Sequence, residues 1–374
     1  MSYYIGVMSG TSLDGIDVAL VENTSDSDCH LVAAQTYDFA PELKQGLKTL
    51  IEDQHCELKK FGELDISLGK AIASAVIKLI NTTNIDIHEI EAIGSHGQTV
   101  FHHPDGQHPF SLQIGNANVI AELTTITTVA DFRQRDMVLL GQGAPLVPAF
   151  HKALFQHPAE NRVIINIGGI SNITALPASN SDKIIGFDTG PGNTLLDAWF
   201  EKHQHAPYDH DGLWAASGSV NKDLLRLLVN DAYFQQAIPK STGREYFNLT
   251  WLDNKLREFK QALVPQDIQA TLTALTAQTI AHDVKQYAPK TDAIYICGGG
   301  AHNSYLMKAL RQLLAHLPVT TTEQLGLDPD WVEACAFAWL ARQSISNKTG
   351  NLPEVTGAKR ATILGGIYSS NDAS

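Results

Sequence analysis

The stretch that decides the fold is YYIGVMSGTSLDGIDVALVE at residues 3–22. An apolar segment at 3–7 is followed by a loop of small and polar residues at 8–15 and by a second apolar segment at 16–22. Short apolar segments bounded by small residues are typical of buried strands. The stretch therefore predicts a strand–loop–strand unit, and residues 30–39 are expected to supply a third strand.

A second stretch has the same design. RVIINIGGISNITAL at residues 162–176 predicts strands at 162–167 and 173–176 around a Gly-rich loop. Another Gly-rich loop at 298–303 follows an apolar segment at 293–297, and it leads into an expected helix at about 304–314. The repeated strand–loop–strand design indicates a candidate internal duplication.

Helices and strands alternate along the rest of the chain. Apolar residues at helical spacing predict a helix over 67–80, and a short strand at 92–94 is expected before a polar loop at 95–99. Further helices are expected at 194–203, 222–229, 252–261, 268–287 and 331–344. This alternation favours an α/β fold.

Length, composition and charge narrow the class of protein. The 374 residues suggest about two domains, and 44% hydrophobic with 18% charged residues argues against bulk disorder. The net charge of -13 would repel polyphosphate backbones, so we expect no nucleic-acid partner. Any small anionic ligand must therefore be bound by local groups.

Cysteine usage and the apolar pattern suggest a compartment. The four cysteines are scattered without a CxxC pair, which argues against a thiolate zinc site or a disulfide framework and fits a reducing cytosol. We find no basic segment followed by an apolar stretch at the start, and no run of 18 apolar residues. We expect a cytoplasmic protein with no membrane partner.

The three Gly-rich loops are candidates for phosphate binding. Small residues let backbone N–H groups approach a phosphate. Neither a P-loop nor a GxGxxG motif occurs, and a tight hairpin is the alternative for any single loop. Three such loops after apolar strands, with Asp14 and Asp17 in the first, favour phosphate and metal binding.

Eight short blocks carry a resemblance to a known family. They are MSGTSLDGID at 8–17, SHGQT at 95–99, ADFR at 130–133, GQGAPLVP at 141–148, NIGGISN at 166–172, FDTGPGN at 187–193, CGGG at 297–300 and EACAFA at 333–338. These blocks resemble the anhydro-N-acetylmuramic acid kinases and extend from residue 5 to about residue 360. Leu140 departs from the pattern, because we expect a second glycine there, and we interpret it as stiffening the loop without affecting the chemistry.

The resemblance implies the superfamily of sugar kinases, heat-shock chaperones and actin. The expected fold is α/β, with two ribonuclease H-like domains and a nucleotide cleft between them. We expect an N-terminal domain of residues 1–130 plus about 350–374, and a C-terminal domain of residues 131–349. Similar enzymes are dimers, so a homodimer is implied.

The resemblance also implies ATP and Mg²⁺ as cofactors and assigns the loops that hold them, whereas the metal ligands stay unassigned. The first phosphate loop comprises Gly10, Thr11, Ser12, Leu13, Asp14, Gly15, Ile16 and Asp17. The second loop comprises Gly168, Gly169, Ser171 and Asn172, and the residues beside the nucleoside are Gly298, Gly299 and Gly300.

Asp188 is the candidate catalytic base. It ends the apolar run 184–187 and precedes a glycine turn, where a residue of a binding cleft is expected. The alternative is that Asp188 caps the following helix, although Asn193 is the better candidate for that cap. The resemblance implies that Asp188 activates a water that opens the 1,6-anhydro bridge of the sugar. The bridging oxygen then takes the phosphoryl group, giving N-acetylmuramic acid 6-phosphate in peptidoglycan recycling.

Five residues are candidate sugar-binding groups, of which Asp131 and Arg133 come first. Alternation in an extended segment would place both on one face, with Asp131 accepting hydroxyl protons and Arg133 reaching the lactyl carboxylate or a phosphate. The alternative is a surface ion pair that involves Arg135 or Asp136.

Glu333 shares an otherwise apolar helix face with Ala336, Phe337 and Leu340. The resemblance makes it a substrate or metal-shell contact, and the alternative is a first-turn glutamate that favours the helix dipole.

His96 and Gln98 are interpreted as parts of a sugar-facing loop. His96, His102, His103 and His108 cluster near Asp105, and His203, His205 and His210 lie near Asp209 and Asp211. Zinc is the alternative, but neither cluster has the helical histidine pair or the thiolates that a zinc site needs.

Three functions stay open at this point. The first is an ATP-dependent sugar kinase that also hydrolyses the anhydro bridge. The second is a glycoside hydrolase with Asp188 and either Asp131 or Glu333 as its carboxylate pair, in which the phosphate loops have no purpose. The third is a non-catalytic nucleotide switch of the actin type, which would not need Asp188, Arg133 or Glu333.

Overall fold

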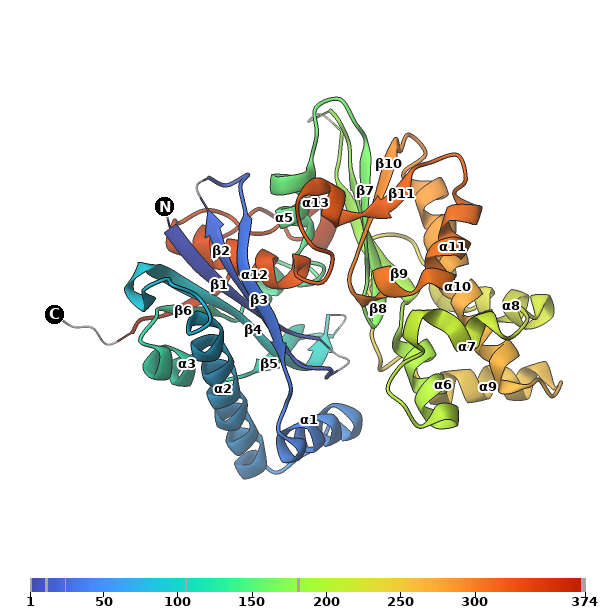
Figure 1. Ribbon diagram of the computed structural model, residues 1–374, viewed down its shortest axis with the longest axis horizontal. Helices are drawn as coiled ribbons and strands as arrows, with labels where there is room; N and C mark the ends of the chain where they lie inside the picture. The colour runs from blue at the N-terminus through green and yellow to red at the C-terminus, as the bar shows by residue number, and fades with distance from the viewer. Residues whose placement is uncertain (1, 11–12, 24, 105, 180–181, 371–374) are drawn as a thin grey trace. The chain divides into compact units, whose positions relative to one another are not determined.

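The computed structural model describes residues 2–10, 13–23, 25–104, 106–179 and 182–370 (Figure 1). The chain divides into two compact units. Unit 1 comprises Met1–Leu154 and Trp331–Ser374, and unit 2 comprises Phe155–Asp330. Residues 131–154 and 331–349, which we had expected in the C-terminal domain, therefore lie in unit 1. Tertiary packing explains this division, since the ring of Phe150 lies 6.2 Å from that of Trp339 and the helix that carries Trp339 covers the sheet of unit 1.

Unit 1 is built on a mixed sheet with the strand order β12-β6-β4-β1-β2-β3, and β5 pairs with β4 (Figure 1). Its strands are β1 (Ser2–Ser9), β2 (Ile16–Asn23), β3 (His30–Tyr37), β4 (Ile90–His103), β5 (Phe110–Ile114), β6 (Thr128–Ala130) and β12 (Gly366–Tyr368). The first three strands are antiparallel, β4 is parallel to β1, and β6 is parallel to β4.

Helices cover both faces of this sheet. The helices are α1 (Pro41–Asp53), α2 (Leu58–Ile80), α3 (Ala117–Thr124), α4 (Gln134–Val138), α5 (Pro148–Phe155), α12 (Val332–Ile345) and α13 (Pro353–Thr356). Ile5 and Val7 of β1 share a core with α1 and α2. Gly6 lies between them and faces the backbone of α12. Because side chains alternate along a strand, α1 and α2 lie on one face and α12 on the other.

Unit 2 repeats the topology of unit 1. Its strand order is β11-β10-β7-β8-β9, which matches β6-β4-β1-β2-β3 in order and in direction. The strands are β7 (Arg162–Ile167), β8 (Ile170–Leu176), β9 (Ile185–Pro191), β10 (Ala293–Cys297) and β11 (Val319–Thr321). The two predicted strand–loop–strand units are thus the hairpins β1–β2 and β7–β8, and both units have the expected ribonuclease H-like order.

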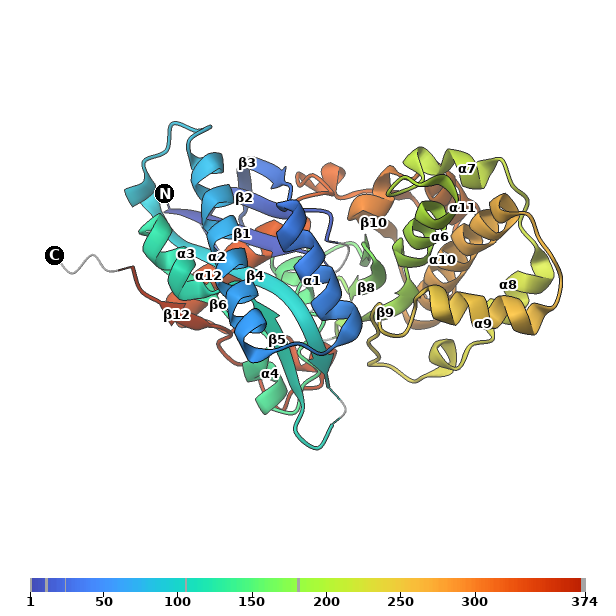
Figure 2. The same ribbon diagram turned by 90° about the horizontal axis from the view of Figure 1, so that it is seen from below.

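Two apolar cores stabilise unit 2. Its helices are α6 (Thr194–Gln204), α7 (Leu213–Ala216), α8 (Lys222–Val229), α9 (Leu249–Phe259), α10 (Pro265–Tyr287) and α11 (Ser304–Leu313). The C-terminal half of α10 packs with α11 against the sheet. Its N-terminal half packs with α6, α8 and α9, which lie together in Figure 2. Helix α10 therefore links the sheet to the helical part of the unit.

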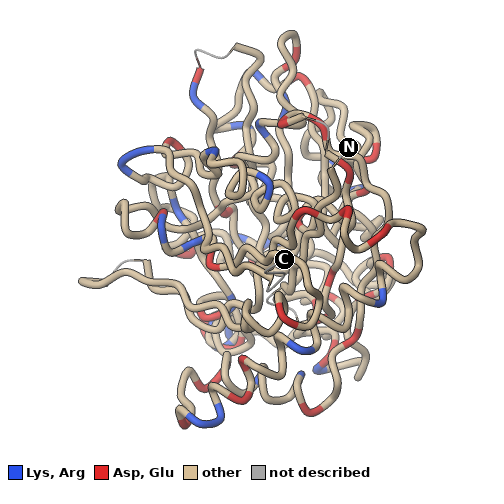
Figure 3. The backbone as a smooth tube through the Cα atoms, turned by 90° about the vertical axis from the view of Figure 1, so that its left-hand side faces the viewer, with Lys and Arg blue, Asp and Glu red and all other residues tan. Residues whose placement is uncertain are grey.

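One expected loop is a strand. Residues 95–99 continue β4, which runs on to His103 and pairs with β1 and β5. The polar side chains of Ser95 and Gln98 are buried in this strand, so the apolar alternation that would have revealed it is missing. Acidic residues are spread over many parts of the chain (Figure 3), and the negative charge is thus not confined to a single site.

Candidate active site

Asp188 lies in a row of paired residues that crosses the sheet of unit 2. Its partner on β8 is Asn172, whose partner on β7 is Asn166, whose partner on β10 is Cys297. Directly paired residues project to the same face of a sheet. Phe187 and Ile165 belong to the core, so Asp188 and Asn166 project to the opposite face. The structure thus brings the candidate base beside the second phosphate loop and the start of the loop at 298–300.

A bulge in β9 sets the direction of Asp188. Ser171 pairs with Gly190 and Asn172 pairs with Asp188, so Thr189 is the extra residue. The Thr189 hydroxyl donates to the Ser171 carbonyl oxygen at 3.2 Å. Bulges of this kind re-aim a side chain at the end of a ladder. Ser171 itself is buried, and its hydroxyl has no hydrogen-bond partner among the described residues.

The backbone and the carboxylate of Asp188 are both held by the segment that follows α8. Asp188 is 8% exposed. Its N–H donates to the Lys240 carbonyl oxygen at 3.1 Å, and the Thr242 N–H donates to its Oδ2 at 3.0 Å. The Tyr233 hydroxyl donates to its carbonyl oxygen at 2.7 Å. These contacts fix the carboxylate on the edge strand of the sheet.

The second phosphate loop caps α6. Gly168 O accepts from Asn193 N at 2.8 Å, and Gly169 O accepts from the N–H groups of Gly192 and Thr194 at 2.9 and 3.0 Å. Asn193 occupies the N-cap position, but its side chain makes no cap bond and donates instead to the Ile167 carbonyl oxygen. Backbone carbonyls thus do the capping that we had expected from Asn193.

The glycines of these loops have two different surroundings. A Cβ on Gly192 would lie 2.4 Å from the Gly168 carbonyl oxygen, and one on Gly298 would lie 2.3 Å from Asn166 Oδ1. A Cβ on Gly168 or Gly299 would meet nothing nearer than 3.7 or 4.0 Å. The first pair permits close packing, whereas a Cβ on either glycine of the second pair would make a single ordinary van der Waals contact. Such sparsely surrounded backbone is suited to the approach of a phosphate or a nucleoside.

The first phosphate loop, in unit 1, is only partly described, because Thr11 and Ser12 lie outside the described residues. Around them, Leu13 N donates to the Gly10 carbonyl oxygen at 3.1 Å. The side chains of Leu13 and Ile16 belong to the apolar core. Asp17 lies on β2, where its carboxylate accepts from the Thr36 hydroxyl at 2.7 Å. Gly15 and Asp14 complete the turn before β2.

His96 of β4 orients Arg133. Arg133 donates from Nε and Nη2 to His96 Nε2 at 3.1 and 2.9 Å, and His96 Nδ1 lies 2.9 Å from the Gly97 carbonyl oxygen. An arginine only donates, so His96 Nε2 accepts and Nδ1 carries the proton. Burial and the Arg133 charge hold the pKa of His96 well below its usual range. Gln98 is buried as well and accepts a hydrogen bond from the Ser9 hydroxyl at 2.6 Å.

The expected extended segment around Asp131 is a turn. Strand β6 ends at Ala130, Asp131 has φ +59°, and Arg133 has helical angles at the start of α4. Asp131 is exposed and lines a cavity of about 400 Å³ together with His96 and Gln134. The assumption of alternation over residues 131–133 was therefore wrong, although Asp131 and His96 share this cavity.

Asp136 is a buried residue whose role the sequence did not reveal. It accepts from Gly143 N at 2.9 Å, from Asn351 Nδ2 at 2.7 Å and from the Thr356 hydroxyl at 2.7 Å. Arg133 Nη1 donates to the Gly143 carbonyl oxygen at 2.8 Å. The DFR and GQGAPL blocks are therefore joined at Gly143. The only signal in the sequence that could have revealed Asp136 is its position between these two blocks.

Glu333 lies in the first turn of α12, which rests on two paired glycines. Gly6 of β1 pairs with Gly94 of β4. A Cβ at these positions would lie 1.7 Å from the Ala334 carbonyl oxygen and 2.0 Å from that of Phe337. Phe337 is one turn after Glu333 and packs against His96 with ring centroids 4.8 Å apart. The helix therefore places half-buried Glu333 one turn from Phe337, the residue that packs against His96.

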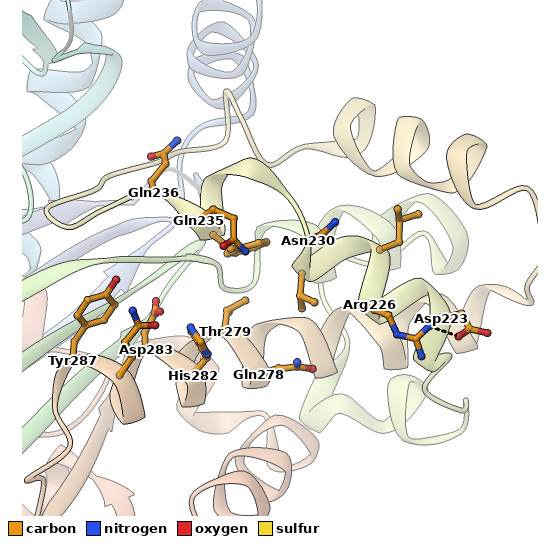
Figure 4. Close-up of a pocket in the computed structure, with 14 residues that line it drawn as sticks. Asp223, Arg226, Asn230, Gln235, Gln236, Gln278, Thr279, His282, Asp283 and Tyr287 are labelled. Carbon is orange, nitrogen blue, oxygen red and sulfur yellow. Dashed lines mark hydrogen bonds and ion pairs between the residues drawn. The ribbon is translucent and has the colours of Figure 1, made fainter.

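The structure also has a second, larger cavity. A cavity of about 730 Å³ in unit 2, between α8 and α10, contains no predicted site residue (Figure 4). Among the residues that the structure describes, no group of three or more His, Cys, Asp or Glu side chains is arranged to hold a metal ion. Asp105 of the first histidine cluster lies outside the described residues. None of the helices described is both long and apolar enough to cross a membrane.

Comparison with known proteins shows the family of this chain. The family model described as anhydro-N-acetylmuramic acid kinase matches residues 2–370. Proteins with that name are similar throughout. The one from Coxiella burnetii (strain RSA 493 / Nine Mile phase I) is 50% identical over 365 residues, covering 98% of this chain and 97% of its own. The one from Pasteurella multocida (strain Pm70) is 51% identical over 367 residues, covering 98% and 96%. The one from Saccharophagus degradans is 49% identical over 370 residues, covering 98% and 99%. With this match and the two ribonuclease H-like units, the chain belongs to the anhydro-N-acetylmuramic acid kinase family.

Proposed function

We propose that this kinase transfers the terminal phosphoryl group of ATP to 1,6-anhydro-N-acetylmuramic acid while water opens the anhydro bridge. The products are N-acetylmuramic acid 6-phosphate and ADP, in peptidoglycan recycling and amino-sugar catabolism. Membership of the anhydro-N-acetylmuramic acid kinase family supports the assignment of this sugar as the substrate. The observation that carries the mechanism is the row that places Asp188 beside Asn172 of the second phosphate loop.

Asp188 is assigned as the base of this reaction. It takes a proton from water, the water oxygen bonds to the anomeric carbon, and the bond from that carbon to the bridging oxygen breaks. The freed oxygen bonds to phosphorus as the bond to ADP breaks, so atoms and charge balance. Phosphoryl transfer depends mainly on positioning and on charge neutralisation. The Thr242 N–H contact supports this role because it holds the Asp188 carboxylate in one orientation.

The nucleotide is assigned to the Gly-rich loops. Gly168, Gly169, Ser171 and Asn172 would hold phosphates, and Gly298 to Gly300 would lie beside the nucleoside. The sparse surroundings of Gly168 and Gly299 fit that role. Mg²⁺ bound with ATP supplies neutralisation of phosphate charge. The lack of a three-ligand group in the described part of the chain fits an ion held largely by substrate phosphates.

The sugar is assigned to groups of unit 1. Arg133 has its guanidinium oriented by His96 and Gly143, which suits recognition of the lactyl carboxylate. Asp131 and Glu333 would accept hydrogen bonds from sugar hydroxyls. His96 and Gln98 are buried, and we assign them to positioning Arg133 and Ser9. A cytoplasmic location and a homodimer belong to the same proposal, and the family resemblance supports them.

The test of this function is Asp188→Asn with the anhydro sugar, magnesium and labelled ATP. Turnover should fall by about 100-fold or more while nucleotide binding is retained, because a carboxamide cannot take the proton. Asp223→Asn, an exposed position on α8, is the matched control and should keep full activity.

Three outcomes would contradict the proposal. Near-normal turnover of Asp188→Asn removes Asp188 from the mechanism. Ring opening without ATP would indicate a hydrolase, and ATP binding without transfer of label to the sugar would indicate a nucleotide switch.

A further inference from the structure

A buried lysine lies behind the strand that carries Asp188. The Lys240 side chain is 2% exposed. Its Nζ lies 3.9 Å from Asp283 Oδ2, and 4.9 and 5.6 Å from the ring centroids of Tyr233 and Phe187. A buried ammonium group is costly unless charges or ring faces compensate it. Lys240 is therefore held on the core side of β9 by one carboxylate and two aromatic faces.

The backbone of Lys240 is also hydrogen-bonded to the backbone of Asp188. Its carbonyl oxygen accepts from Asp188 N, and Thr242, two residues later, donates to the Asp188 carboxylate. Burial lowers the pKa of Lys240, while the Asp283 and Asp188 carboxylates act in the opposite direction. The Lys240 ammonium therefore lies 3.9 Å from the Asp283 carboxylate and 5.6 Å from the ring centroid of Phe187, the residue that precedes Asp188 on β9.

Asp283 is the second carboxylate of this group. It lies on α10 and is 4% exposed, and its Oδ2 accepts no hydrogen bond from the described residues. Burial raises its pKa to about 6, and the charges of Lys240 and His282 oppose that rise. Asp283 also lines the cavity of about 730 Å³, beside His282 and Tyr287 (Figure 4).

We propose that Lys240 is a positioning residue for Asp188, and that its positive charge, shared with Asp283, keeps the Asp188 carboxylate ionised for its role as a base. This inference rests on the proposed function of Asp188. The titratable groups around Lys240 are Asp283 from α10, the Tyr233 hydroxyl from the 3-10 turn Ala232–Gln235 and, across strand β9, Asp188, with His282 beside Asp283.

The charges in this group predict that removal of Lys240 and removal of Asp283 affect the ionisation of Asp188 differently. Without Lys240, two buried carboxylates remain with no cation between them, so ionisation of Asp188 becomes harder. Without Asp283, an ammonium that stays charged serves Asp188 alone, so ionisation of Asp188 becomes no harder. Loss of the Asp283 charge also favours the neutral form of Lys240, so the test of this arm needs a cation that cannot lose its proton. The Tyr233 hydroxyl stays protonated, because burial followed by the charges of Asp188 and Asp283 raises its pKa. It therefore adds no negative charge.

The experiment is the pH profile of kcat/KM for sugar phosphorylation by the full chain. In Lys240→Met the acidic limb should move to higher pH by about 0.5 to 1 unit, with activity recovering as the pH rises. Lys240→Arg keeps the charge and should restore the wild-type limb. Lys202→Met removes an exposed lysine of the same unit and should leave the profile unchanged. Substrate ionisation is common to every variant and cancels in the comparison.

Asp283→Asn separates electrostatics from packing. It is combined with Lys240→Arg, because a guanidinium stays charged without the Asp283 carboxylate, and the acidic limb of this double variant should lie at or below the wild-type pH. An upward shift like that of Lys240→Met in the double variant would indicate a general packing defect and overturn the proposal. If Lys240→Met does not fold, the double variant decides alone by the same criterion.

The failure of this inference is distinguishable from failure of the proposed function. An unmoved limb in folded Lys240→Met, together with an inactive Asp188→Asn, overturns the role of Lys240 only. Full activity of Asp188→Asn overturns the base assignment itself.

Discussion

Replacing Gly6 with alanine should displace helix α12 and the glutamate that it carries. The added Cβ would lie 1.7 Å from the Ala334 carbonyl oxygen and 2.7 Å from Ala338 N. Real Cβ contacts essentially never fall below 3.0 Å, so the helix must move by at least 1.3 Å. Both obstacles are backbone atoms, and no side-chain rotation can relieve the clash. Glu333 directly precedes Ala334 and would move with it.

The magnitude follows from the size of this clash. Overpacking a core costs about 1 to 3 kcal/mol, and a shift of a helix backbone belongs at the upper end, at about 3 kcal/mol. In a unit of this size, about 3 kcal/mol corresponds to a fall in Tm of about 6 to 12 °C. A displacement of about 1 Å at a substrate-binding group can lower the rate by about 100-fold. Both stability and kcat/KM should therefore fall.

Calorimetry of Gly6→Ala and a kinase assay below its Tm check both effects. Gly62→Ala is the matched control, because a Cβ on Gly62 of α2 would meet nothing within 4 Å. That control should stabilise the protein by about 0.5 to 1 kcal/mol, since alanine is the better helix former. A Tm of Gly6→Ala within about 2 °C of the wild type, with unchanged kcat/KM, would refute the reasoning.

Two further predictions concern unit 1. Burial lowers the pKa of His151 to about 3. The contribution of this residue to the free energy of unfolding is therefore fully present above the unfolded-state pKa of about 6.5. It is lost as the pH falls toward 3, by up to about 1.4 kcal/mol per pH unit. His151→Gln should therefore lose less Tm between pH 7.5 and pH 5 than the wild type, and an equal loss would exclude this cause. Leu140 is exposed and has the left-handed φ of +68°. Leu140→Gly should relieve about 1 kcal/mol of backbone strain. Glycine loses more conformational entropy on folding, which offsets this gain, so Tm should change little. Leu213→Gly, at a right-handed position, should lower Tm, and equal losses in the two variants would contradict the strain argument.

Local features were predictable from the sequence because they depend on neighbours a few residues apart. Apolar segments bounded by glycine predicted the hairpins β1–β2 and β7–β8, and helix α8 has the expected bounds at 222 and 229. The motif blocks also identified the family, and the matching family model and relatives confirm that identification. At Leu140, where the family pattern suggested glycine, the backbone has the left-handed angle that favours glycine.

Other features depend on partners that are distant along the chain. Asp136 bonds to Asn351 across 215 positions, and α12 joins unit 1 because Gly6 and Gly94 let its backbone approach the sheet. In the part of β4 at 95–99, buried Gln98 finds its partner in Ser9, which lies 89 positions earlier in the chain.

The sequence by itself determined the hairpins, most of the helices and the family, since turn chemistry and periodicity are local properties. It also marked Asp188 as a candidate. Only the tertiary structure decided what surrounds that carboxylate, because strand register pairs Asp188 with Asn172, and chain folding brings Lys240 and Asp283 together behind the strand. A buried charge is tolerated only where distant segments supply its partners, and no local pattern records which segments those are.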